Sequence, residues 1–74
     1  MELTEKDKRA LRSSKLLRTC TERNFLWSTI ETIGKVLRPT RNDPLAHDRL
    51  VIKLLELVEN SETEEEVLEK LETF

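Results

Sequence analysis

The segment from 44 to 59 constrains the fold most, because it has the length of a helix and carries apolar side chains on almost every side. Asp43 and Pro44 mark its start, since Asp suits the N-cap and Pro suits the first helical position. Its polar side chains form only a narrow strip: Arg49, Lys53 and Glu56, with Asp48 beside them. A helix that is apolar nearly all round is buried nearly all round. We therefore expect residues 44–59 to form the central helix of a bundle.

Three further helices are predicted at about 5–18, 20–37 and 62–73. Each start carries a pair of residues with the spacing of a capping box: Thr4 and Asp7, Thr19 and Glu22, Ser61 and Glu64. The second helix could equally continue the first, because nothing between residues 18 and 23 breaks a helix, but we favour a break there. Pro39 ends the second helix, since proline disfavours helical geometry in the residue before it.

Apolar spacing assigns a buried face to each of these helices. On the first helix we expect that face to be a narrow stripe, with Leu11 and Leu16 beside it: Leu3, Ala10, Ser14, Leu17 and Thr21. On the second helix the stripe is broader: Leu26, Ile30, Ile33 and Leu37, widened by Phe25 and Val36 on one side and by Trp27 and Gly34 on the other. Gly34 indicates close helix packing within the chain or a slight bend of the helix, with a notch for another crossing helix as the functional alternative, and we favour packing.

The fold class is therefore all-α, a compact three- to four-helix bundle formed by one domain over residues 1–74, as a monomer or a dimer. One Gly and two Pro are too few for the turns of a sheet protein. Cys20 is the only cysteine, so no intrachain disulfide can form. A free thiol, the absence of a secretory signal and the absence of a membrane-length apolar run favour a cytoplasmic protein that does not enter a membrane.

Catalytic chemistry has no support in the sequence. A nucleophilic Cys20 would need a base, and His47 is the only histidine. One Cys and one His do not make a zinc site, and a single glycine does not make a phosphate-binding loop. We expect no enzyme activity, no cofactor and no metal.

Charge is divided unevenly along the chain. Residues 1–41 hold ten Lys/Arg and five Asp/Glu, whereas residues 42–74 hold three and ten. The candidates for binding an acidic partner or nucleic acid lie on the predicted first helix: Lys8, Arg9, Arg12, Lys15 and Arg18. The plainest interpretation is a solvated face that pairs loosely with acidic residues, and an acidic protein surface ranks ahead of a nucleic-acid backbone because the pI is 5.4.

Large apolar residues exceed what so short a chain is expected to bury alone, which favours a homodimer or another protein partner. The candidates for partner contact are Phe25, Trp27, Leu45, Ile52 and Leu55. Trp27 is ordinarily a core residue at such a position, but an exposed Trp is a candidate binding hot spot.

The sequence thus predicts a small non-enzymatic protein-interaction module, a regulator or inhibitor that binds a host or partner protein. The alternative is a nucleic-acid-binding protein that uses its basic first helix on DNA or RNA backbones. Short, charged, stand-alone chains of this style are typical of phages, viruses and plasmids, which is an analogy and not a sign of homology.

Overall fold

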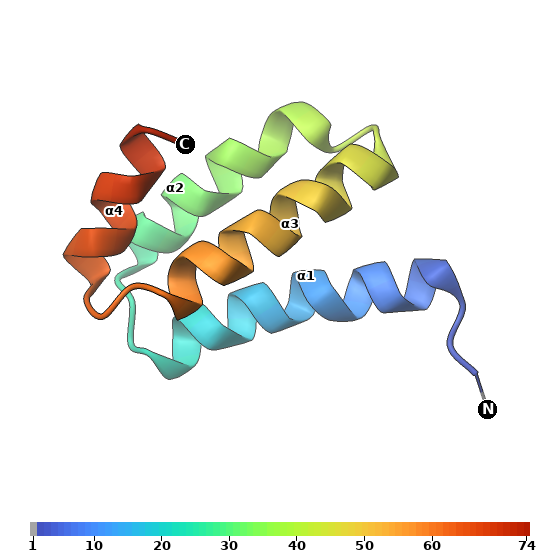
Figure 1. Ribbon diagram of the computed structural model, residues 1–74, viewed down its shortest axis with the longest axis horizontal. Coiled ribbons are helices and arrows are strands. Elements are labelled where there is room, and N and C mark those ends of the chain that lie inside the picture. The colour runs from blue at the N-terminus through green and yellow to red at the C-terminus, as the bar shows by residue number, and fades with distance from the viewer. Residues whose placement is uncertain (1) are drawn as a thin grey trace.

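The computed structural model describes residues 2–74 and contains four α-helices and one turn of 3-10 helix: α1 (Glu5–Glu22), α2 (Trp27–Leu37), η1 (Arg38–Thr40), α3 (Pro44–Glu59) and α4 (Glu64–Glu72). The all-α prediction is confirmed. In Figure 1, α3 lies between α1 and α2, and α4 covers the end of the bundle where α2 begins and α3 ends. The chain passes along α1 and α3 in the same direction and along α2 in the opposite one. Within the described residues, no helix is both long and apolar enough to cross a membrane.

The core is built mainly on α3, as predicted for the central helix. Four α3 side chains are buried, and the other helices each add one or two: Val51, Leu54, Leu55 and Val58 meet Leu16 and Cys20 of α1, Ile33 of α2, and Val67 and Leu71 of α4. Both α1 and α2 pack on α3 more than on one another. One side of α3 faces solvent. It carries the polar strip and, on the same side, the exposed side chains of Leu45 and Ile52.

The predicted break between the first two helices lies further along the chain than expected. α1 continues through Thr19 to Glu22, so the expected capping box at these two residues does not form. The helix ends where Asn24 takes a φ of 57°. Asn tolerates this left-handed conformation better than most residues do. The chain changes direction there, and the next two residues, Phe25 and Leu26, lie outside any helix.

The predicted buried face of α1 is also wrong. Leu16 and Cys20 enter the core, whereas every member of the expected stripe from Leu3 to Thr21 is exposed. Arg12 lies on the same side of the helix as Leu16 and Cys20, and its guanidinium donates two hydrogen bonds to the Asp48 carboxylate of α3 at 2.8 and 2.6 Å. This pairing makes a polar residue compatible with the packed side of α1.

The other helix starts are partly as predicted. Thr4 and Asp7 form the expected capping box, and Asp43 caps α3 by accepting a hydrogen bond from the Ala46 N–H at 3.2 Å. At α4, however, the cap is Thr63, whose hydroxyl accepts from the Glu66 N–H. Ser61 is instead buried and donates to a carbonyl at the end of α3, which removes it from the capping position.

Two side chains fasten the end of the bundle that α4 covers. Arg23 donates to the carbonyl oxygens of Val58, Ser61 and Glu62 at and beyond the end of α3. A cation is favourable there because the carbonyl end of a helix is partially negative. The carboxylate of Glu64 accepts a hydrogen bond from the Leu26 N–H at 2.7 Å. Leu26 is the N-cap residue of α2 and its side chain makes no capping hydrogen bond, so Glu64 is the side chain that caps this helix start.

Candidate functional site

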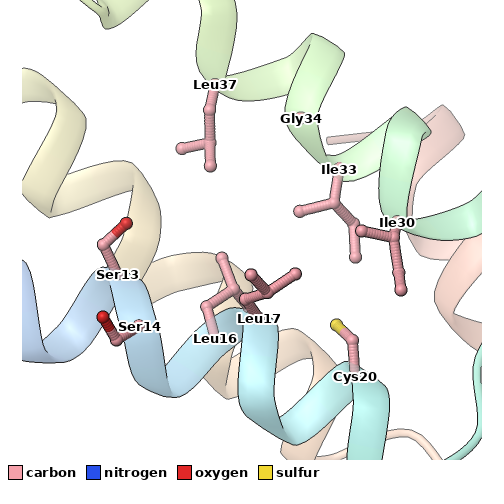
Figure 2. Close-up of a pocket in the computed structure, with 9 residues that line it drawn as sticks. All are labelled: Ser13, Ser14, Leu16, Leu17, Cys20, Ile30, Ile33, Gly34 and Leu37. Carbon is pink, nitrogen blue, oxygen red and sulfur yellow. The ribbon is translucent and has the colours of Figure 1, made fainter.

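An open apolar groove runs between α1 and α2. Its volume is about 270 Å³, and its walls come from both helices: Ser13, Ser14, Leu16, Leu17 and Cys20 of α1 face Ile30, Ile33, Gly34 and Leu37 of α2. Figure 2 shows the apolar side chains of the two walls directed toward one another across a gap. Because α3 separates the two helices, their facing sides are not closed by mutual packing.

The exposed stripe of α1 forms one lip of this groove. Leu17 is 53% exposed and Ser14 is exposed, yet both line the groove. Ala10 and Leu11 of α1, with Leu3 just before the helix, line a second open hollow that shares Ser14 with the groove. The sequence identified this stripe correctly as a continuous side of the helix but assigned it to the wrong environment.

Gly34 lies on the opposite lip, and the space beside its Cα is open in the part of the chain that the structure describes. A methyl group placed at its Cβ position would have no heavy atom within 4 Å. The prediction that Gly34 permits close helix packing within the chain is therefore wrong. A glycine in a helix costs about 1 kcal/mol relative to alanine, and nothing within the chain offsets that cost at this position.

Cys20 forms part of the groove's floor and is only 1% exposed. Burial raises the pKa of its thiol because the charged thiolate is poorly solvated there. A protonated, buried thiol is a poor nucleophile, so Cys20 acts as a small apolar wall residue.

Cationic side chains predominate around the groove. The adjoining hollow that shares Ser13 contains Lys6 and Arg9, and the one that shares Gly34 contains Lys35 and Arg38. Among residues 2–74, none of these four cations is in an ion pair. Two carboxylates also border the groove, Glu31 and Asp7, and that of Asp7 accepts the Thr4 N–H in the α1 cap.

The predicted apolar contact residues do not form one surface. Trp27 is 69% exposed at the start of α2, on the same edge of that helix as Gly34, which follows it by two turns. Leu45, 62% exposed, and Ile52 lie on the outer side of α3. Phe25 is half-buried against the core beneath the Arg23 guanidinium, 5.4 Å from its ring centre. Leu55 is buried, so it cannot touch a partner in this conformation.

The five basic residues predicted to bind an acidic partner or nucleic acid (the basic row of α1) have different surroundings in the structure. Arg12 is held by Asp48, and their contact lowers the pKa of the Asp48 carboxyl and raises that of Arg12. Lys15 lies 3.8 Å from Glu59 of α3, and Lys8 lies 3.6 Å from Glu5 on its own helix, both in exposed pairs. Arg9 borders the groove, and Arg18 is exposed in a separate hollow with Glu22. The row therefore does not present five unpaired cations to a phosphate backbone.

Two functional features had little or no signal in the sequence. The groove depends on which side of α1 is buried, and the contacts on that side are long-range, including a pairing between residues 36 positions apart. Arg23 looks like any solvated arginine in the sequence. Gly34 was the one local sign, because a glycine inside an apolar helix face requires an explanation.

Among residues 2–74, no three His, Cys, Asp or Glu side chains gather in a group that could hold a metal ion. No family model matches the chain, and neither a curated protein nor a solved structure matches it significantly.

Proposed function

We propose that this protein is a small non-enzymatic interaction module that regulates or inhibits another protein by binding it through the groove between α1 and α2. The observation that supports this most directly is the open apolar groove itself, with half-exposed Leu17 on one lip and uncontacted Gly34 on the other. Water covers this apolar area in the isolated chain, and a partner that displaces the water gains free energy roughly in proportion to the area covered.

Binding to a protein is better supported than binding to nucleic acid. The basic row of α1 has Arg12 in a two-hydrogen-bond pair with Asp48 and two lysines beside glutamates. Phosphate binding requires cations that are free to replace counterions. An apolar groove contributes little to contacts with a phosphate backbone.

Affinity capture with two matched variants tests the proposal. Leu17→Glu places a charge in the groove, and Leu45→Glu places one at a similarly exposed position on α3. Both should keep the helical circular dichroism of the parent chain. Proteins captured from the producing organism should be retained by Leu45→Glu and lost with Leu17→Glu. Identical capture by the parent and both variants would contradict binding through exposed apolar residues.

A homodimer is the other arrangement that exposed apolar residues favour. Size-exclusion chromatography with light scattering measures the mass of the parent chain and of both variants. A parent dimer that becomes a monomer with Leu17→Glu would place a second copy in the groove. A parent monomer leaves the groove free for a different protein.

A further inference from the structure

Taking the proposed function as its basis, we infer that the groove receives an α-helix of a partner protein, with an apolar face flanked by Asp and Glu. The inference rests on three properties of the groove: its walls are two antiparallel helices, its lips carry small residues, and its surroundings are cationic.

The shape of the groove suits a helix. α1 and α2 run in opposite directions on the two sides of α3, so a helix laid in the groove would lie between them and over α3 (Figure 1). Ser13, Ser14 and Gly34 allow a second backbone to come close, since none of them has a long side chain. The volume of about 270 Å³ is below the usual range for small-molecule pockets but has room for a few aliphatic side chains.

Gly34 gives independent support for a close approach at this lip. Its missing side chain leaves open space and is not used by any neighbour within the chain. An incoming helix would use that space, because glycine lets a crossing backbone approach closely. Trp27, on the same edge of α2, would then lie beside the incoming helix as an apolar anchor.

The charge around the groove favours acidic residues on either side of the apolar face of the incoming helix. Four cations that have no ion pair with any of the residues from 2 to 74 border the groove: Lys6, Arg9, Lys35 and Arg38. They outnumber the two bordering carboxylates, and one of those already caps α1. Acidic flanks would be attracted to these lips and basic flanks repelled.

A second copy of the chain is a poorer match for the groove than a different protein. The described chain has acidic flanks on α4, but Leu68 is the only large apolar side chain that this helix exposes along its length. The apolar stripe of α1 has the required row of residues but carries Lys6 and Arg18 at its sides. Neither helix combines an apolar row with acidic flanks.

Two synthetic helical peptide libraries test this inference. Each peptide has about 18 residues, which is five helical turns, with Leu, Ile, Met or Phe randomised at the apolar positions. One library has Glu at the flanking positions and the other has Lys. Selection on the immobilised protein should enrich the Glu-flanked library. Enrichment of Lys-flanked peptides, or of neither library, would overturn the inference.

Variants of the protein then locate the bound peptide. At Gly34 an added Cβ has no heavy atom within 4 Å, so Gly34→Leu should extend its side chain over the lip and lower the affinity for an enriched peptide at least tenfold. The pair Lys35→Glu and Arg38→Glu should weaken it similarly, whereas Arg49→Glu with Lys53→Glu, the same charge change on the exposed side of α3, should leave its affinity unchanged. Equal affinity for Gly34→Leu and the parent chain would exclude docking at this lip.

The failure of this inference can be separated from the failure of the proposed function. If captured proteins depend on Leu17 but are not displaced by an excess of an enriched Glu-flanked peptide, the groove binds a protein but not through an acidic helix. If capture does not depend on Leu17 at all, the proposed function itself fails.

Discussion

At the scale of single residues, the molecule contains one position that lowers its stability and one that raises it in a way the sequence does not reveal. Gly34 lies inside α2, and a Cβ at its position would have no heavy atom within 4 Å. Arg23 lies between α1 and α2 and joins the end of α3 to the segment that follows. Arg23 thus has a long-range role within the chain, whereas the role that we propose for Gly34 is toward a partner.

Replacing Gly34 with alanine should stabilise the isolated protein. Alanine favours the helix by about 1 kcal/mol over glycine, and its methyl group meets open space. Urea unfolding followed by circular dichroism should show the gain in unfolding free energy. The same variant should bind a captured partner or an enriched peptide more weakly. A stabilised variant with full affinity would contradict a close approach at Gly34.

Replacing Arg23 with lysine should destabilise the protein by about 2 kcal/mol, because a lysine cannot hold the three carbonyl oxygens with one planar group. Urea unfolding measures the loss. Arg18→Lys is the matched control, since Arg18 is exposed and has no hydrogen bond or ion pair within residues 2–74. Equal free energies of unfolding for the two variants would show that the Arg23 hydrogen bonds do not stabilise the fold.

At the scale of helices, the ion pair between Arg12 and Asp48 connects α1 to α3 and introduces a pH dependence. The pKa of Asp48 is lowered below its usual value by the hydrogen bonds from Arg12. Its contribution to stability is therefore complete above the usual Asp pKa of about 4 and is lost as the pH falls further, toward the lowered pKa.

Asp48→Asn should accordingly be less stable than the parent chain at pH 7, and the difference should shrink as the pH falls below about 4. Urea unfolding at a series of pH values measures it. Glu59→Gln, which disrupts only the exposed pair with Lys15, should show a smaller difference at pH 7. A difference for Asp48→Asn that stays constant from pH 7 to pH 3 would contradict the role of the ionised carboxylate.

The sequence predicted most helix starts but not how each helix turns about its axis. The start at Asp43 and Pro44 and the cap at Thr4 are local, since their hydrogen bonds span three residues. The orientation of α1 involves contacts with α3, among them the pair with Asp48, which lies beyond two other elements. Helical spacing favoured the Leu17 stripe as the core face, but spacing alone carries no information on the contacts with α3 that bury Leu16 and Cys20.

At the scale of the whole molecule, the prediction that so short a chain cannot bury all of its large apolar residues agrees with the structure. Not all of the large apolar side chains between residues 25 and 58 are buried, since Leu26, Trp27, Leu45 and Ile52 remain exposed. The sequence could not say where the exposed area would concentrate. The groove lies between α1 and α2, and none of the residues that line it was among those predicted to contact a partner.

Burial of Cys20 in the groove floor makes the global stability measurable through its thiol. An aromatic disulfide reagent should react slowly with the native chain, because the thiol is both buried and protonated, and rapidly with the chain unfolded in urea. The reaction rate should rise with urea together with the loss of helical circular dichroism. A native rate close to the unfolded one would show that α1 detaches readily from the core.

Support of α1 and α2 by α3 also has a consequence for the order of folding. As the chain leaves the ribosome, the first two helices are complete before the helix that holds both of them has been made. They have little to collapse against, and helices of their length are marginal in water on their own. Tertiary structure must therefore wait for residues 44–59, and until these emerge the nascent N-terminal half exposes its apolar side chains to chaperones and proteases.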